Sequence, residues 1–310
     1  MENRIRKNFM MVFCFIVVCI AVTSKAFTAS AASVETETVK NGLYHEGENW
    51  NYYENGIIAE DKETLSKYNG SWWYVKNGKV DFGKTTICYY NGSWWYVENG
   101  RVNFNKTTIF RDNDRHLFSY NGKSYCYDWF YIHNGRVDFT ARTVYKYNGI
   151  WWFINAGKID FNVETVVNYG GTWYYVKNGQ INWNTTTLCK YNNAWWYIKN
   201  GKIDFSTTTL QRFGNTAKVM KYSDGASRVY YDWYYVHNGK VDFSAETLCK
   251  YNGSWWYVKN GKVDYDDNTL VKYGNNWYWV GDGRVNWNAS YPNMEYKGNY
   301  YTVQNGVVVF

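Results

Sequence analysis

A 22-residue period of tight turns, most of them Asn-Gly, constrains this chain more than any other feature of its sequence. Placed in register, the turn glycines stand at positions 56, 78, 100, 135, 157, 179, 201, 239, 261, 283 and 306. Two steps are longer, 35 and 38 residues, which indicates inserts of 13 and 16 residues near 110–127 and 212–231. Self-similarity of this depth is typical of an array in which each repeat buries its apolar surface only against its neighbours.

The residues between the turns favour strands. The stretch KYNGSWWYVKNGKVDF, residues 67–82, carries aromatic and β-branched residues in short runs, and no helical periodicity is present. Asn-Gly supplies the two positive-φ residues that a type I′ hairpin turn requires. We therefore predict an all-β solenoid of about eleven stacked β-hairpin repeats over 48–310, preceded by a degenerate N-terminal cap at 32–47.

The hairpin register predicts which side chains are buried. A two-residue turn at 77–78 sets Val75 opposite Val80 and Trp73 opposite Phe82. We expect this apolar face to be the core and the opposite face to be exposed. The assignment depends on the register at the other turn of the repeat, 69–70, because a slip of one residue moves every side chain to the opposite face.

The opposite face carries aromatic rings beside carboxylates. Trp72 and Tyr74 are two residues apart on one strand, and Asp81 lies across the hairpin from Tyr74. Such rings can hold a quaternary ammonium by cation–π attraction, or stack on sugars while the carboxylate accepts hydroxyl hydrogen bonds. In some repeats asparagine replaces the aspartate, which favours a sugar; the rings can also serve only as packing between hairpins. The candidate ligand-binding residues are Trp72, Tyr74, Asp81, Trp94, Tyr96, Trp151, Asp160, Trp195, Tyr197, Asp204, Trp255, Tyr257 and Asp264.

The motif NGSWWYVKNGKV resembles the choline-binding and glucan-binding (YG-type) repeats of Gram-positive surface proteins. The resemblance covers roughly 48–310. It implies a β-hairpin solenoid, export, and non-catalytic attachment to a cell-wall polymer, such as choline-bearing teichoic acid, or to a glucan. It also implies that the first and third aromatics of each motif, such as Trp72 and Tyr74, are cage walls. This chain has Asp81-Phe82 after Val80, where many members of the family have the Gly-Trp dipeptide that closes the choline cage.

The first 31 residues follow a different pattern. Basic residues precede an apolar run from Phe9 to Val22, and small residues follow at 29–31. This order is typical of a cleaved secretory signal peptide, since 14 apolar residues are fewer than the ~20 that span a bilayer. We expect a secreted, extracellular protein with no transmembrane segment after cleavage.

Charge and cysteine content argue against a nucleic-acid-binding protein, a disulfide-bonded fold and a zinc protein. The net charge of +7 falls to about +4 without the signal peptide, and the basic residues are spread along the repeats, so we expect no nucleic-acid partner. Cys88, Cys189 and Cys249 share one repeat position that elsewhere holds valine or glutamine, which indicates buried fillers rather than disulfides or zinc ligands. The repeated aspartates have one spacing throughout, and no repeat carries a unique acid, nucleophile or metal cluster. We therefore expect no catalytic residues, no metal and no cofactor.

The two inserts suggest an alternative function. Both precede a shared Tyr-Asp-Trp sequence, at 127–129 and 231–233, and both are expected to lengthen a hairpin. In this alternative the chain is a structural or adhesive surface array that binds a protein partner through the inserts. Deletion of 110–126 would then abolish partner binding and spare polymer binding.

Overall fold

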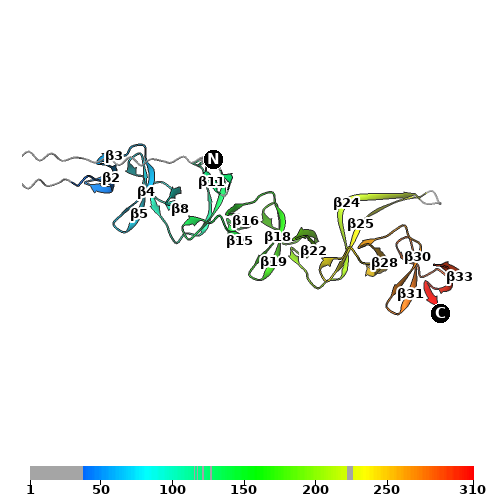
Figure 1. Cartoon of the computed structure of the whole chain (residues 1–310). Coiled ribbons are helices and arrows are strands. Elements are labelled where there is room, and N and C mark those ends of the chain that lie inside the picture. Colours follow the sequence, from blue (N-terminus) through cyan, green and yellow to red (C-terminus); the bar gives the residue numbers. More distant parts are fainter. Residues whose placement is uncertain (1–37, 115, 117, 121, 126–127, 222–225) are drawn as a thin grey trace, which may run out of the picture. The chain divides into compact units, whose positions relative to one another are not determined.

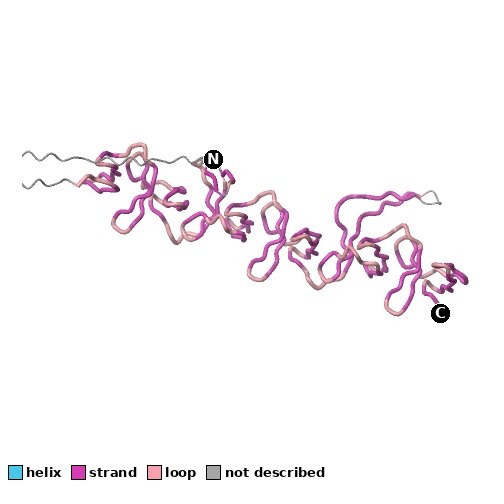
Figure 2. The backbone as a smooth tube through the Cα atoms, viewed as in Figure 1, coloured by secondary structure: helices cyan, strands magenta, loops and turns pink. Residues whose placement is uncertain are grey.

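The computed structural model describes residues 38–310 except 115, 117, 121, 126–127 and 222–225, so the expected signal peptide lies outside the described residues. The chain divides into two parts, Met1–Val39 and Lys40–Phe310, and the strands belong to the second part. The described residues form strands and loops without any helix (Figure 2). No segment of them is therefore a membrane-crossing helix.

Apart from β11 (Phe118–Tyr120) and β12 (Lys123–Tyr125), the strands follow one another in units of three. Figure 1 labels some of these strands. Within the described residues there are eleven such units, counted from the N-terminus, each with a first, a second and a short third strand. The first strands are β1 (Gly42–Glu46), β4 (Glu63–Tyr68), β7 (Thr86–Tyr90), β10 (Thr108–Arg111), β15 (Arg142–Tyr147), β18 (Glu164–Tyr169), β21 (Thr187–Tyr191), β24 (Thr209–Lys221), β27 (Thr247–Tyr251), β30 (Thr269–Tyr273) and β33 (Tyr291–Tyr296).

The second and third strands complete each unit. The second strands are β2 (Asn49–Glu54), β5 (Ser71–Lys76), β8 (Ser93–Glu98), β13 (Trp129–His133), β16 (Ile150–Asn155), β19 (Thr172–Lys177), β22 (Ala194–Lys199), β25 (Ser227–His237), β28 (Ser254–Lys259), β31 (Asn276–Gly281) and β34 (Asn299–Gln304). The third strands are β3 (Ile57–Ile58), β6 (Lys79–Val80), β9 (Arg101–Val102), β14 (Arg136–Val137), β17 (Lys158–Ile159), β20 (Gln180–Ile181), β23 (Lys202–Ile203), β26 (Lys240–Val241), β29 (Lys262–Val263), β32 (Arg284–Val285) and β35 (Val307–Val309). The all-β repeat fold predicted from the sequence is confirmed, and β1, which pairs with β2, lies in the segment expected to be a degenerate cap.

The Asn-Gly turns have the predicted backbone. Asn77 and Gly78 have φ angles of 52° and 71°, as a type I′ turn requires. The predicted pair Val75 and Val80 is present in the ladder. At the other turn of the unit, 69–70, the register sets Leu65 opposite Tyr74.

Consecutive units are joined by backbone hydrogen bonds. The third strand of each unit pairs with the second strand of the unit before it, as Arg101 does with Trp73. The backbone N–H of Tyr74 in the second unit donates to the carbonyl of Gly100 in the third unit at 2.8 Å. One 33-stranded sheet results.

The hydrophobic core is divided among the interfaces between units. Leu65 and Tyr74 of the second unit pack on Cys88, Val97 and Val102 of the third unit. Equivalent clusters recur along the chain. Each inner hairpin therefore buries both of its faces, one against the preceding unit and one against the next.

The predicted division into a buried and an exposed face is wrong. Tyr74 is 0% exposed, as is Val75, whereas Phe82 is 47% exposed. The reason is that a hairpin inside an array has a neighbour on each face, so neither face is left to solvent. The equivalent tyrosines Tyr96 and Tyr257 are buried in the same way.

The cysteines of the repeat are fillers, as expected. Cys88, Cys189 and Cys249 are buried free thiols. Burial raises the pKa of Cys88 and Cys189 to about 12 and that of Cys249 to about 11. At neutral pH these thiols are protonated and unreactive.

The two inserts have different structures. The expectation that the first insert lengthens a hairpin is wrong, because it forms its own two-stranded sheet, β11 (Phe118–Tyr120) paired with β12 (Lys123–Tyr125). The second lengthens a hairpin, as expected: β24 and β25 continue past their neighbours (Figure 1), with a register shift between Arg212 and Ala217.

Candidate functional site

Four aromatic rings surround a pocket between the fourth and fifth units. Trp129 comes from the fourth unit, and Tyr147, Trp152 and Phe161 come from the fifth. The pocket has a volume of about 230 Å³. The centroids of Trp129 and Tyr147 are 6.1 Å apart, and those of Trp152 and Phe161 are 5.5 Å apart in a T-shaped arrangement. We call such a set of four rings an aromatic cage.

The same four positions are aromatic at nine interfaces of the described residues. The first and second rings are 4.8 to 6.1 Å apart, and the third and fourth are 5.4 to 6.4 Å apart. The nine sets are Trp50, Tyr68, Trp73 and Phe82; Trp72, Tyr90, Trp95 and Phe104; Trp129, Tyr147, Trp152 and Phe161; Trp151, Tyr169, Tyr174 and Trp183; Trp173, Tyr191, Trp196 and Phe205; Trp195, Phe213, Tyr234 and Phe243; Trp233, Tyr251, Trp256 and Tyr265; Trp255, Tyr273, Tyr278 and Trp287; and Trp277, Tyr296, Tyr301 and Phe310.

In four cages, a backbone contact fixes the orientation of a third ring that is tryptophan. The indole N–H of Trp73 donates to the carbonyl of Tyr68 at 3.3 Å, and that of Trp95 donates to the carbonyl of Tyr90 at 3.1 Å. The polar edge of each indole is thus satisfied by the main chain, which leaves the ring faces for apolar or cationic contacts. The fourth ring is the most open wall, since Phe161 is 43% exposed.

The predicted tryptophans form cage walls. Trp72, Trp151, Trp195 and Trp255 are each the first ring of a cage, and each is half-buried. Trp94 has the same position at the interface between the third and fourth units. The second, third and fourth rings were not among the predicted site residues, because three of the four walls belong to the next unit along the chain.

The predicted tyrosines lie in the core beneath the cages. The hydroxyl of Tyr74 donates to a carboxylate oxygen of Glu63 at 2.7 Å, and that of Tyr257 donates to Glu246 at 3.1 Å. Burial, followed by the hydrogen bond to Glu63, raises the pKa of Tyr74 far above its ordinary value. Tyr96 and Tyr197 are also buried.

The predicted aspartates stabilise turns. Asp81 accepts a hydrogen bond from the backbone N–H of Gly83 at 3.1 Å, and Asp160 and Asp264 accept equivalent bonds two residues on. The hydroxyl of Thr207 is the main cause that lowers the pKa of Asp204. In a sister unit, the side-chain oxygen of Asn182 accepts a hydrogen bond from the backbone N–H of Asn184 at 3.3 Å. The exchange of aspartate for asparagine therefore follows from a shared turn geometry.

The interface between the third and fourth units differs from the others. Asp112 stands where other units have the second ring, and His116 of the first insert takes the ring position, 5.4 Å from Trp94. The Nδ1 atom of His116 is 3.1 Å from a carboxylate oxygen of the buried Asp112. That hydrogen bond raises the pKa of His116, although burial acts in the opposite direction.

The same cluster offers the one group of potential metal ligands among the described residues. Ligand atoms of Asp112, Asp114 and His116 lie within 4.8 Å of one another. Asp114 is also 2.6 Å from Lys84 Nζ and accepts a hydrogen bond from the Thr86 hydroxyl at 2.6 Å. The carboxylates therefore have hydrogen-bond and ion-pair partners within the protein, and a metal ion is not needed to balance their charge.

The sequence profile of the choline-binding repeat matches residues 61–81, 83–103, 143–160, 162–182, 184–204, 229–242 and 244–264. These matched segments therefore belong to the choline-binding repeat family, as the motif indicated. No curated protein matches the sequence.

Two solved structures from Streptococcus pneumoniae are similar to the chain. One is CbpJ, which is 18% identical with a TM-score of 0.32, covering 86% of this chain and 99% of its own. The other is choline binding protein F, which is 15% identical with a TM-score of 0.34, covering 88% of this chain and 100% of its own.

Proposed function

We propose that this protein is a secreted, non-catalytic binding protein that attaches to a choline-bearing cell-wall polymer through its aromatic cages. The observation that carries the proposal is the recurrence of the four-ring cage at interface after interface. A quaternary ammonium donates no conventional hydrogen bond, so it suits a cavity walled by rings. Each favourable ring contributes ~0.5 to 2 kcal/mol of cation–π attraction.

The lining of the cage favours choline over a glucan. Besides the four rings, the pocket between the fourth and fifth units is lined by Asn148, Ile150 and Ile159. A sugar in this position would leave most of its hydroxyls without partners, which is costly. The aspartates of the turns, such as Asp81 and Asp264, already accept backbone hydrogen bonds.

Repetition gives such weak sites a strong combined effect. A polymer that carries choline at intervals can occupy several cages of one chain at once. Linked sites raise avidity by ~10² to 10⁴ when the spacing allows simultaneous contact. Attachment would then be firm although each cage exchanges its ligand quickly.

The test is competitive elution from cell walls. The chain from residue 32 onward is applied to purified Gram-positive wall and washed first with soluble glucan, then with free choline. We expect release by choline only. Release by glucan, or no retention, would contradict the proposal.

A single-cage variant tests the site itself. Phe161→Leu removes an exposed cage wall and keeps apolar bulk, so the affinity of that cage for choline should fall by roughly 2- to 30-fold. The matched control is Tyr89→Leu, because Tyr89 is exposed, aromatic and outside the nine cages. Calorimetric titration with choline should show one fewer site of wild-type affinity for the first variant and no change for the control. Equal binding by both variants would count against the cage.

A protein partner at the second insert is a second candidate function. Val219 of β24 and Val229 of β25 lie directly opposite each other and are 60% and 53% exposed. An exposed apolar pair on a projecting hairpin favours contact with another protein. The variant Val219→Thr with Val229→Thr should lose such a partner and keep wall binding; loss of both, or of neither, would refute this function.

A further inference from the structure

Two positions face each other across every interface between units. One is the residue immediately before the cage tryptophan, and the other begins the third strand of the next unit. Between the fourth and fifth units these are Asp128 and Lys158, whose charged groups are 2.9 Å apart. Between the eighth and ninth units they are Asp232 and Lys262, 3.2 Å apart. At these interfaces the array supplies its own anion to the basic side chain.

Three interfaces carry a serine and an arginine at the same two positions. The serine is too short to replace the aspartate and brings no charge. Within the part of the chain that the structure describes, none of the three arginines forms an ion pair with a carboxylate. The pairs are Ser71 with Arg101, Ser93 with Arg136, and Ser254 with Arg284.

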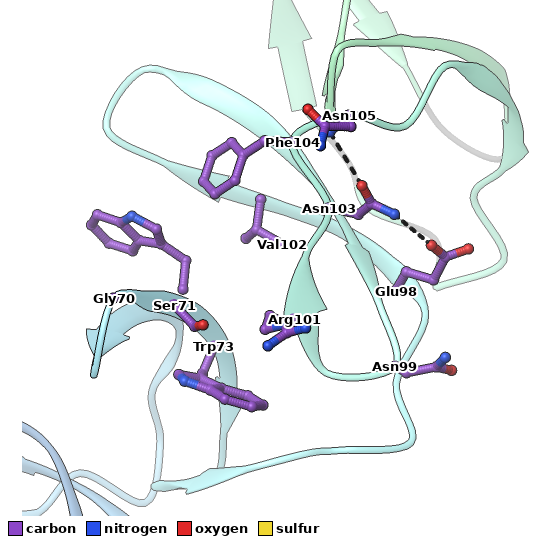
Figure 3. A pocket seen from close by; sticks show the side chains of 11 residues that line it. Gly70, Ser71, Trp73, Glu98, Asn99, Arg101, Val102, Asn103, Phe104 and Asn105 are labelled. Atoms are coloured by element: carbon purple, nitrogen blue, oxygen red, sulfur yellow. Dashed lines mark hydrogen bonds between the residues drawn. The ribbon is translucent and has the colours of Figure 1, made fainter.

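Each serine–arginine pair lines a groove. The three grooves have volumes of about 780, 450 and 750 Å³. Figure 3 shows the first, in which Ser71, Trp73, Arg101 and Asn103 lie around the opening. Arg101 is held over the ring of Trp73 at 5.5 Å. We call these three sites the Ser–Arg grooves.

The carboxylates that line the Ser–Arg grooves are already engaged. Glu98 accepts hydrogen bonds from Lys106 at 2.6 Å and from Asn103 at 2.8 Å. In the second groove, Asp138 accepts a hydrogen bond from the hydroxyl of Thr140 at 2.6 Å. In the third, Asp282 lies 4.0 Å from Arg228. Among the described residues, these guanidinium groups are thus left without a carboxylate partner.

We propose that the Ser–Arg grooves bind phosphate groups. At the two interfaces with Asp128 and Asp232, the same position holds a carboxylate against a basic side chain, so the backbone geometry accepts an oxyanion there. The planar guanidinium can donate two parallel hydrogen bonds to phosphate oxygens, and the serine hydroxyl can donate a third. An external phosphate replaces the aspartate that these interfaces lack.

The first groove shares walls with an aromatic cage. Trp72 and Phe104 line the groove and are also the first and fourth rings of the cage between the second and third units. If the cages hold choline, a polymer with phosphate next to choline would fill both sites together. This extension rests on the proposed function, whereas phosphate binding in the grooves does not.

The test replaces each serine by aspartate, the residue that occupies this position at two other interfaces. Ser71→Asp, Ser93→Asp and Ser254→Asp together give each arginine an internal partner and should leave the fold intact, because Asp128 and Asp232 occupy this position naturally. The probe is inorganic phosphate in equilibrium dialysis at constant ionic strength. Wild type should retain phosphate, and the triple variant should bind it at least about tenfold more weakly, as expected for the loss of a charge-assisted contact.

Two controls make the result specific. Lys158→Ala with Lys262→Ala removes basic groups that are already paired, and this variant should retain phosphate as wild type does. Asp128→Ser with Lys158→Arg should create a fourth groove and raise the phosphate capacity. Acetate bound as tightly as phosphate, a wild type that retains no phosphate, or a triple variant that retains it fully would overturn the proposal.

A choline titration separates this inference from the proposed function. The triple variant should bind free choline like wild type, while the preference of wild type for phosphocholine over choline should disappear. Failure of wild type to bind choline would refute choline binding by the cages. Phosphate retention would then still test phosphate binding by the grooves. Retention of the phosphocholine preference in the triple variant would refute the grooves alone.

Discussion

The two kinds of turn glycine differ in what surrounds them. Gly92 has a φ of 79° and open space where a Cβ would lie. Gly100 has a φ of 74°, but a Cβ there would lie 2.5 Å from the carbonyl oxygen of Asp81 and 2.6 Å from the Cα of Phe82. The first glycine serves only the turn, whereas the second also lets one unit approach the backbone of the unit before it.

This difference predicts unequal effects of one substitution. Gly92→Ala should cost ~1 to 2 kcal/mol of unfolding free energy, the cost of an alanine in the left-handed region. Gly100→Ala should cost clearly more, because backbone on the preceding unit must also move. Urea unfolding followed by tryptophan fluorescence measures both, and equal losses would contradict the role given to close approach.

The burial of single residues could be predicted from the sequence only in part. The Asn-Gly turns and the fillers Cys88 and Cys189 were predicted because local conformation and repeat position determine them. The burial of Tyr74 was not, since it depends on the neighbouring unit that covers the opposite face. At the interface where Asp112 stands in place of the second ring, His116 takes the position of that ring. The repeat period could not predict this, because His116 lies inside an insert.

The first insert is an element that docks on the array. Its Asp114 accepts a hydrogen bond from Lys84 at 2.6 Å, and its His116 contacts Trp94. The Nε2 atom of His116 is also 3.5 Å from Glu63. The sequence indicated where the insert begins and ends, but tertiary contacts alone decide that it folds back onto the second and third units.

Docking of the insert should weaken as the pH rises. The hydrogen bond to Asp112 raises the pKa of His116 above its ordinary value of 6.5. A raised pKa means that the folded state holds the proton more tightly, so this stabilisation is complete below pH 6.5 and is lost as the pH passes the folded-state pKa. His116→Gln should remove the effect.

Thermal unfolding at about pH 6 and about pH 9 checks this expectation. The wild-type midpoint should fall more between the two values than the midpoint of His116→Gln. His133→Gln is the matched control, since His133 is exposed and outside the insert. Identical pH profiles for wild type and His116→Gln would show that the insert does not respond to this histidine.

At the scale of the whole molecule, we expect stability to rise with the number of interfaces between units, and choline capacity to rise with the number of cages. The solenoid class and its period were predictable because every repeat shows the same turns. The cages were only half predictable, since the first ring is part of the Trp-Trp-Tyr motif while the others come from the next unit. Pairing between units decides which rings meet, and that pairing is not visible in a single repeat.

Removal of the last unit, residues 290–310, tests this additivity. The remaining units should stay folded, with a modest decrease in the unfolding midpoint, because each unit contacts only its neighbours. Choline capacity should fall by one site, the cage of Trp277, Tyr296, Tyr301 and Phe310. Circular dichroism and calorimetry measure the two effects, and loss of all structure would rule out an additive array.

The backward pairing of each third strand also bears on how the chain folds. Arg101 pairs with Trp73, only 28 residues earlier, and the same short span recurs along the array. Low contact order of this kind favours fast folding, because little loop entropy is lost before the native contacts form. A chain that emerges N-terminus first can therefore complete each unit as soon as the next one appears, so that only the newest unit lacks its closing strand.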